Sequence, residues 1–257
     1  MITTFSKFYY GIEITFDNCK LDFNEGAGEL TATLELGTYT PTEIAQEVED
    51  QLNATGLLTY TVAFNRSTRI LTITASSSMT LLKNTGTNAA DSAYVTLGFT
   101  TASNATGTSF VAPNVCCSVY SPQYVLQSYV AVEDMIEQLH CTVNETVTGV
   151  QELITYGDMR MMKCNITFIT DIAQPSDGPI LNNASGLSDA RTFLRWIAKK
   201  NKIEFMPDKN TVSTFLNLVI DSAATSKEGT TMYLKEMYSK GLVGYFETDT
   251  LTFREIA

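Results

Sequence analysis

Histidine is almost absent from this chain, which excludes the commonest catalytic mechanisms. The 257 residues include a single histidine, His140. A serine or cysteine nucleophile that is activated by an imidazole would have to use this one residue. The sequence also contains neither a G-x-S-x-G motif nor a glycine-rich loop that follows a strand and opens a helix. We therefore predict that the protein is not an enzyme, has no catalytic residues and binds no cofactor.

Patterns typical of metal sites are missing as well. No C-x-x-C motif occurs, the number of cysteines is odd and two of them are adjacent. The five cysteines are Cys19, Cys116, Cys117, Cys141 and Cys164. Because no ligands stand at hairpin or helix spacing, the sequence predicts no metal site. It predicts reduced, buried thiols, as in a protein that is made in a reducing cytoplasm.

Acidic residues leave one catalytic alternative open. Glu133 with Asp134, or Asp177 in the loop QPSDGP, are of the residue type that glycoside hydrolases use in pairs. The sequence gives no distance between these groups, and acids in loops are usually just solvated. A hydrolase is therefore the third hypothesis, behind the two that are given below.

Positive charge and long apolar runs are also scarce. Lys and Arg number 17 against 28 Asp and Glu, which gives a net charge of −11. The densest basic segment, RWIAKKNK, stands where a helix would end. Nucleic-acid binding relies on clustered basic residues, so we predict no specific nucleic-acid binding. No apolar run approaches the ~20 residues of a membrane span, and the first residues lack a secretory pattern, so we expect no membrane partner.

One helix is clearly written in the first half, in the segment YTPTEIAQEVEDQLN. Thr40 is suited to cap it, Pro41 fits its first turn, and Glu43 completes a capping box. The apolar residues recur every four positions and share one face: Ile44, Val48 and Leu52. The sequence therefore predicts a helix over residues 41–53 that packs this face on a sheet.

Alternating segments on both sides of this helix supply the sheet. Residues 29–36 alternate strictly, with Leu30, Ala32, Leu34 and Leu36 on the apolar face. Residues 58–64 and 70–75 read as an antiparallel hairpin that is joined by the turn NRSTR. Gly26 and Gly28 in NEGAGEL indicate a turn rather than a phosphate loop. Residues 1–110 are thus predicted to be a strand–helix–hairpin module, with the small polar segment 100–109 as a linker.

The second half, residues 111–257, is again rich in strand patterns. Residues 123–133 alternate, and residues 146–157 and 159–170 read as two strands with a hairpin turn at Gly157 and Asp158. Ser188 or Asp189 is suited to cap a helix that carries the apolar residues Phe193, Leu194, Trp196 and Ile197 and is stopped by Pro207.

The last segment, TLTFREI, alternates again and predicts a terminal strand with Leu251 and Phe253 inward and Arg254 outward. The predicted fold class is α+β and rich in β-structure, with two sheet-based units. The first is the strand–helix–hairpin module, and the second is a mainly antiparallel unit, like a β-sandwich or barrel, with one or two helices.

Several segments, taken in order, resemble a module found in structural proteins of tailed bacteriophages. In the first half they are FDNCKLDFNEGAGELTATLELGTYTPTEIAQEVEDQLN, YTVAFNRSTRILTITAS and SAYVTLGF. In the second half they are FLRWIAKKNKIEFMPD and KGLVGYFETDTLTFRE. The resemblance covers most of residues 16–100 and 190–256. It rests on pattern and order, so it implies virion assembly and carries over no active-site residue.

The resemblance implies a virion structural protein, in particular a ring-forming tail subunit near the distal tail or the baseplate. Its partners would be copies of itself and other tail proteins, namely tube, hub and fibres. It would reside in the virion tail after synthesis in the cytoplasm of a host bacterium. DNA would pass through a lumen lined by the surplus acids, which are predicted to face solvent. A tail-tube subunit and a head–tail connector stay open as positions in the particle.

The second hypothesis is a carbohydrate- or receptor-binding module of the same particle. Such a module needs aromatic faces that are open to solvent. The segments SKFYYG and VGYFE contain the aromatic residues that would have to be exposed.

Overall fold

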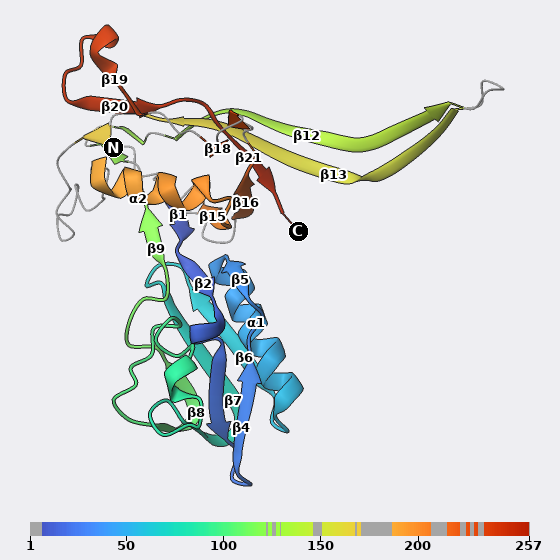
Figure 1. Cartoon of the computed structure of the whole chain (residues 1–257), viewed down its shortest axis with the longest axis vertical. Helices are drawn as coiled ribbons and strands as arrows, with labels where there is room; N and C mark the ends of the chain where they lie inside the picture. Colours follow the sequence, from blue (N-terminus) through green and yellow to red (C-terminus); the bar gives the residue numbers. More distant parts are fainter. Residues whose placement is uncertain are drawn as a thin grey trace. The chain divides into compact units, whose positions relative to one another are not determined.

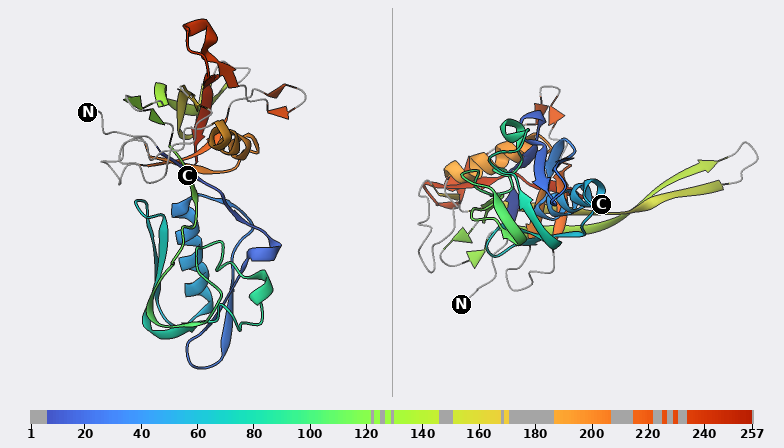
Figure 2. Two further views of the ribbon diagram at one scale, coloured as in Figure 1. Left: turned by 90° about the vertical axis from the view of Figure 1, so that its left-hand side faces the viewer. Right: turned by 90° about the horizontal axis from the view of Figure 1, so that it is seen from below.

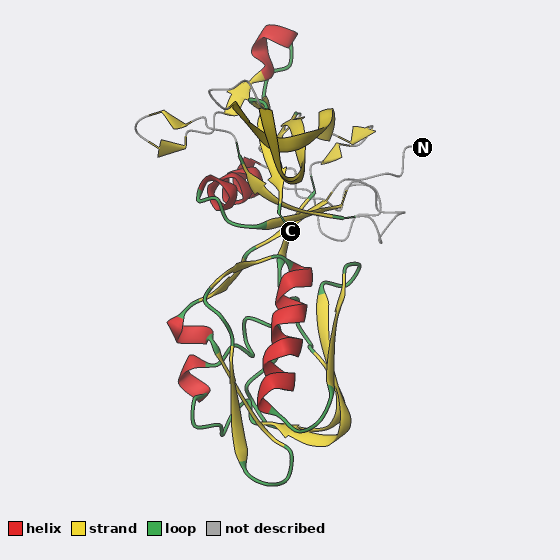
Figure 3. Ribbon diagram, turned by 90° about the vertical axis from the view of Figure 1, so that its right-hand side faces the viewer, coloured by secondary structure: helices red, strands yellow, loops and turns green. Residues whose placement is uncertain are grey.

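The computed structural model describes residues 7–121, 123–124, 127–128, 130–145, 151–167, 169–170, 187–206, 215–221, 225–226, 229–230 and 234–256. This part of the chain contains two α-helices among many antiparallel strands, which confirms the predicted α+β, β-rich class (Figures 1 and 3). The chain divides into two compact units. We call Tyr9–Val119 the N-proximal unit, and Met1–Phe8 with Tyr120–Ala257 the ribbon unit. The division thus lies later than the predicted boundary at residue 110, and the first residues go with the second unit.

The N-proximal unit combines one helix with two antiparallel sheets. Its helix is α1 (Pro41–Thr55), and η1 (Phe16–Asn18) and η2 (Ala89–Asp91) are short 3-10 turns. Its strands are β2 (Ile12–Ile14), β3 (Lys20–Asn24), β4 (Glu29–Thr33), β5 (Gly37–Tyr39), β6 (Tyr60–Asn65), β7 (Ile70–Leu81) and β8 (Ala105–Val111). The larger sheet has the order β4-β3-β7-β6, with β8 also paired to β7, and β2 pairs with β5.

Helix α1 begins as the sequence predicts. The Glu43 N–H donates to Thr40 Oγ1 at 3.3 Å, and the Thr40 N–H donates to Glu43 Oε2 at 2.9 Å, so the capping box is formed. Pro41 occupies the first turn, and the Gly56 N–H closes the last turn on the Leu52 carbonyl at 2.8 Å. The predicted apolar face is buried: Ile44, Val48 and Leu52. The helix is therefore held by its caps and by one packed face.

The strands around α1 confirm the predicted hairpin, but one of the predicted strands is shorter than expected. Strands β6 and β7 pair antiparallel from Tyr60 opposite Ala75 to Asn65 opposite Ile70. The alternating segment 29–36 is a strand only as far as Thr33, and Leu36, which was predicted to lie on the apolar face, is 46% exposed. The alternation of apolar and polar residues therefore continues in the sequence beyond Thr33, the last residue of β4 that pairs with β3.

The predicted linker at residues 100–109 is wrong, because half of it, residues 105–109, belongs to strand β8. Strand β8 pairs antiparallel with β7, from Thr72 opposite Val111 to Leu81 opposite Ala105. Only Phe110 of this strand is buried. Small polar residues are typical of linkers, yet here the backbone hydrogen bonds to β7 hold them in the sheet.

The ribbon unit contains the second helix and the remaining strands. The helix is α2 (Leu187–Ala198), and η3 (Met237–Lys240) is a 3-10 turn. Its strands are β1 (Lys7–Tyr10), β9 (Ser118–Tyr120), β10 (Gln123–Tyr124), β11 (Gln127–Ser128), β12 (Val130–Glu145), β13 (Gln151–Ile166), β14 (Ile169–Thr170), β15 (Ile203–Met206), β16 (Leu216–Ile220), β17 (Thr225–Ser226), β18 (Gly229–Thr230), β19 (Leu234–Glu236), β20 (Tyr245–Thr248) and β21 (Leu251–Glu255). Seven of them form an open row in the order β12-β13-β21-β16-β15-β1-β9.

Two local predictions for this unit are wrong. Gly157 and Asp158 do not form a hairpin turn, because β13 runs through them and pairs with β12, where Gly157 stands opposite His140. Helix α2 carries the predicted apolar residues, but it begins at Leu187, so that Ser188 and Asp189 lie inside its first turn. It ends at Ala198, before β15, so Pro207 does not stop it. The loop 174–186 and Pro207 lie outside the described residues.

The core of the ribbon unit is built on aromatic residues from distant parts of the chain. The ring of Phe8 lies 4.9 Å from that of Phe193, 4.8 Å from that of Phe205 and 6.1 Å from that of Phe253. Phe253 and Leu251 are buried and Arg254 is exposed, as predicted for the last strand. Strand β21 is paired on both sides, with β13 and with β16, so it is an internal strand of the sheet.

The chain passes between the two units twice, and both passages use strands of the ribbon unit's sheet. It leaves through β1 and returns through β9. These two strands are neighbours at one end of the row of seven strands. The other end of that row is β12.

Candidate assembly surface

Strands β12 and β13 form a long two-stranded ribbon that extends beyond the rest of their sheet (Figures 1 and 2). Each strand has 16 residues, and they pair from Val130 opposite Ile166 to Glu145 opposite Gln151. Only residues 161–164 of β13 also pair with β21. The ribbon thus has a root inside the sheet and a distal half, residues 138–145 and 151–158, outside it.

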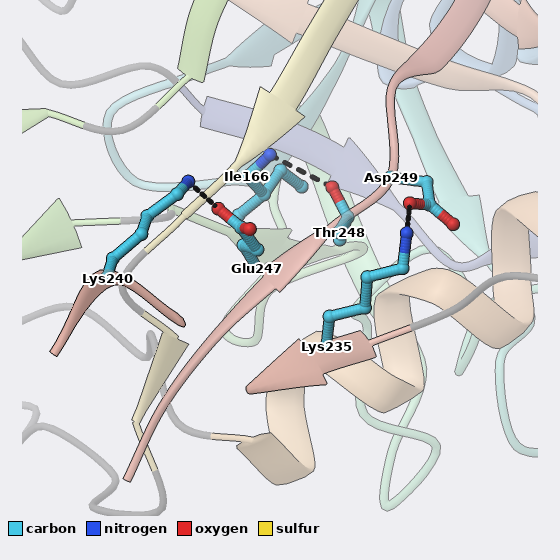
Figure 4. Close-up of polar contacts among 6 residues, drawn as sticks. All are labelled: Ile166, Lys235, Lys240, Glu247, Thr248 and Asp249. Atoms are coloured by element: carbon cyan, nitrogen blue, oxygen red, sulfur yellow. Dashed lines mark hydrogen bonds and ion pairs between the residues drawn. The ribbon is translucent and has the colours of Figure 1, made fainter. Parts of the chain in front are cut away.

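The root of the ribbon is firmly held. Met162, Cys164 and Ile166 are buried in the core of the unit. The Ile166 N–H donates to Thr248 Oγ1 at 3.0 Å, and this hydroxyl is buried at the end of β20 (Figure 4). On either side of Thr248, Lys240 Nζ contacts Glu247 Oε2 at 2.5 Å, and Lys235 pairs with Asp249. The three buried side chains and the Ile166–Thr248 hydrogen bond thus hold the root of the ribbon in the unit.

The distal half has no such support within the described chain. Its two strands, each about 25 Å long at ~3.3 Å per residue, pair only with each other. An isolated two-stranded hairpin is marginally stable in water. The outer edge of β12 also leaves a row of backbone N–H and C=O groups without a strand partner. A ribbon of this kind is stabilised when another molecule covers it.

The N-proximal unit shows the opposite arrangement, because side chains of α1 occupy the free edge of its sheet. The Tyr60 N–H donates to Asn53 Oδ1 at 2.8 Å, and Asn53 Nδ2 donates to the Tyr60 carbonyl at 3.0 Å. The Val62 N–H donates to Glu49 Oε2 at 2.8 Å. Three outward backbone groups of β6, the N–H and C=O of Tyr60 and the N–H of Val62, are thus bonded to the helix rather than offered to another strand. The start of this edge is therefore blocked to strand addition.

The same unit uses its acidic residues structurally. Six carboxylates accept hydrogen bonds from backbone N–H groups: Asp22, Glu25, Glu29, Glu43, Glu47 and Glu49. The Asp22 side chain is almost fully buried and also accepts from Thr31 Oγ1 at 2.7 Å. The acidic surplus was predicted simply to face solvent and line a lumen. In this unit six carboxylates also bond loop and edge donors, and Glu29 among them remains exposed.

Glu25 is the most heavily bonded of these carboxylates. It accepts from the Leu57 N–H at 2.9 Å, from the Leu58 N–H at 3.1 Å and from the Tyr60 hydroxyl at 2.5 Å. Burial acts to raise the pKa of Glu25, but these three donors together lower the pKa below its ordinary value. Burial and the nearby carboxylate raise the pKa of Tyr60 in turn. Glu25 therefore holds the chain that links α1 to β6 while it is ionised.

We expect the N-proximal unit to lose stability on acidification, in part through Glu25. A carboxyl group whose pKa is lowered by folding contributes stability above its unfolded pKa, near 4.3, and that contribution is lost as pH falls through the lower folded pKa. Glu25→Gln is expected to cost about 1–2 kcal/mol at pH 7 and to flatten the acid limb of the stability curve. Urea unfolding between pH 7 and pH 3, followed by hydrogen exchange of β6, measures both effects. Glu13→Gln, at an exposed position, is the control, and equal curves for both variants would contradict the role of Glu25.

Of the residues that the sequence singled out for chemistry, those whose side chains are described lie in several separate elements. Cys19, Cys116, Cys117 and Cys164 are buried thiols, as predicted, whereas the side chain of Cys141 lies outside the described part. A hydrogen bond with Cys117, aided by Arg69, lowers the pKa of the Cys116 thiol. Among the described residues no group of three or more His, Cys, Asp or Glu is placed to hold a metal ion.

His140, Glu133 and Asp134 all lie on β12, in the ribbon. The strand register shifts between Val132 and Asp134 and again after His140. Asp177, the other acidic candidate, lies outside the described residues. Sequence reasoning missed the ribbon itself, because it placed a turn at Gly157, in the middle of what is one long strand, β13.

Comparison of the chain with known protein-family models and with curated protein sequences finds no match. No helix in the described ranges has the length and apolar character that crossing a membrane requires.

Proposed function

We propose that the protein is a structural subunit of a tailed-bacteriophage virion, a ring-forming tail component near the distal end or baseplate. The observation that carries the proposal is the β12–β13 ribbon, whose distal half is covered by no other described element. A monomer gains little from a long, solvated pair of strands. A subunit that lays this pair on its neighbour gains an interface.

The contrast between the two units supports this reading. The N-proximal unit blocks the start of its β6 edge with α1, whereas the ribbon unit ends in the open strand β12. Natural proteins usually block exposed edges, so an edge of 16 residues that no described strand pairs points to a partner. If one surface of each copy meets a different surface of the next, the contact repeats until a ring closes. The partners are then copies of the chain and the neighbouring tail proteins.

The carbohydrate- or receptor-binding alternative loses one of its two aromatic segments. Phe8, Tyr9 and Tyr10 of the segment SKFYYG are buried, so they offer no open ring face to a sugar. In VGYFE, Tyr245 and Phe246 are half-buried in β20. The assembly proposal therefore stands first.

Shortening the ribbon tests the proposal. Replacing residues 139–158 with Asn-Gly joins the paired residues Gln138 and Met159 through a two-residue turn and leaves the root intact. We expect the wild-type protein to form rings by negative-stain microscopy and a defined oligomer by light scattering. The shortened variant is expected to remain a soluble monomer with an unchanged melting temperature, because the core does not use the distal half.

A matched control rebuilds another hairpin turn without shortening the ribbon. Ser67→Asn with Thr68→Gly changes the turn between β6 and β7 to the same dipeptide. This variant is expected to assemble like the wild type. A wild-type protein that stays monomeric at high concentration, or a shortened variant that forms the same rings, would refute the proposal.

A further inference from the structure

In the described part of the chain, four exposed basic residues lie in α2 or directly after its last residue, Ala198. Elsewhere in the described chain most basic side chains are engaged: Lys20 donates to Thr33, Arg66 to Thr42 and Arg69 to the Cys117 carbonyl, while Lys235 and Lys240 pair with carboxylates. By contrast, Arg191, Arg195, Lys199 and Lys200 are exposed, and the described part of the chain provides no ion pair for any of them. We call these four residues the basic row.

The basic row follows from the way α2 packs. Arg191 and Arg195 are spaced four apart, so they lie on one side of the helix, about 6 Å apart along its axis at ~1.5 Å per residue, and Lys199 and Lys200 directly follow its last residue, Ala198. The opposite side packs in the core through Phe193, Leu194 and Ile197. The core thus orients the helix, and the row faces solvent as a fixed line of cations.

The distal half of the ribbon carries the opposite charge. Residues 138–158 include Glu145, Glu152 and Asp158 and contain neither Lys nor Arg. Nearer the root, acids and bases stand opposite one another in the register, with Asp134 across from Lys163 and Glu137 across from Arg160. At the root of the ribbon two of the three acids thus have a base opposite them, whereas the acids toward its end have none.

The ribbon and the basic row of one chain do not meet. Both belong to the ribbon unit, and the ribbon leaves this unit away from α2 in two perpendicular views (Figures 1 and 2). The principal neighbours of α2 are β14 and β16, and neither β12 nor β13 is among them. Opposite charges that are separated in one copy become complementary between two copies.

We propose that the distal half of the ribbon docks on the basic row of α2 in a second copy of the chain. The inference rests on the proposed function and names its interface. The two surfaces are different, so the contact is head-to-tail and each copy has one of each to offer its neighbours. Pairing of two β12 edges about a two-fold axis is disfavoured, because β12 contains Glu133, Asp134, Glu137 and Glu145 and no Lys or Arg, and like charges would face each other.

Charge exchange between the two surfaces tests the proposal. The helix variant carries R191E, R195E and K199E, the ribbon variant carries E145K, E152K and D158K, and a third protein carries all six changes. Each single-surface variant is expected to lose assembly by at least about tenfold in apparent Kd, because like charges then meet. An equimolar mixture of the two, and the six-fold variant, are expected to recover assembly. Higher salt is expected to weaken wild-type assembly.

The control has the same charge change as the ribbon variant but places it on the N-proximal unit. E13K, D17K and D91K alter three exposed acids there and are expected to leave assembly unchanged. Circular dichroism and melting curves of every variant check that the fold is retained.

The outcomes separate the two proposals. A wild-type protein that does not assemble would refute the proposed function and, with it, this interface. A wild-type protein that assembles, together with single-surface variants that assemble equally well or fail to rescue one another, would overturn the interface alone. Normal assembly of the helix variant with loss of binding to a DNA oligonucleotide would assign the basic row to nucleic acid instead.

Discussion

Replacing Phe253 with aspartate is expected to unfold the ribbon unit. Phe253 is fully buried in β21, which is paired on both sides, and its ring packs near that of Phe8. Loss of a buried aromatic ring costs about 3–5 kcal/mol, and an unpaired buried carboxylate adds several kcal/mol. The sum approaches the whole stability of a typical domain, roughly 5–15 kcal/mol. We expect an insoluble product, or a soluble one without near-ultraviolet dichroism and without a cooperative transition in this unit.

The adjacent residue provides the matched control for this variant. Arg254 lies on the same strand but is exposed, so Arg254→Asp introduces the same carboxylate without burying it. Surface changes of this kind usually stay within about 0.5–1 kcal/mol. A Phe253→Asp protein that melts together with the wild type would show that β21 does not occupy the middle of the sheet.

Val48→Asp is expected to have the largest effect in the N-proximal unit. Val48 is fully buried on the face of α1 that covers the sheet, between Ile44 and Leu52. The substitution removes apolar burial and places an unpaired charge there, at a cost of about 3–5 kcal/mol. For a unit of this size that lowers the melting temperature by ~10 °C or more. Hydrogen exchange of α1, β6 and β7 in the full chain, read by mass spectrometry, localises the loss.

An exposed position in the same helix isolates the effect of burial. Ala54→Asp adds the same side chain near the end of α1, where it remains in solvent. It is expected to cost at most about 1 kcal/mol, because a carboxylate is slightly unfavourable at a helix C-terminus. Equal protection of β6 and β7 in both variants would contradict the assignment of the buried face.

Local signals made part of this fold predictable from the sequence. The capping box of Thr40 and Glu43 and the four-residue spacing of Ile44, Val48 and Leu52 gave α1 because both act within one or two turns. Alternation identified β21, because Leu251 and Phe253 face one packed core. These features need no knowledge of the rest of the chain.

The remaining errors arose where distant pairing decides the structure. Strand β8 has one buried residue, Phe110, so no apolar pattern marks it, and only its pairing with β7 makes it a strand. Gly157 carries turn chemistry, yet β12 continues opposite it and the register shifts beside His140 instead. The candidate assembly surface could not be predicted for the same reason, because it too depends on how distant strands pair. Which strand ends a sheet, and whether a helix closes that edge, depends on topology rather than on local sequence.

The way in which the chain enters and leaves the ribbon unit has a consequence for its evolutionary history. Residues Tyr9–Val119 depart from β1 and return at β9, and these two strands are neighbours in one sheet. The N-proximal unit therefore has the connectivity of a cassette that was inserted at a single site in a host domain. Such a cassette can be gained, lost or exchanged at the β1–β9 end of the sheet, because the other five strands of the row, from β12 to β15, pair without it. Relatives that keep the ribbon and α2 are thus free to carry an unrelated module in this position.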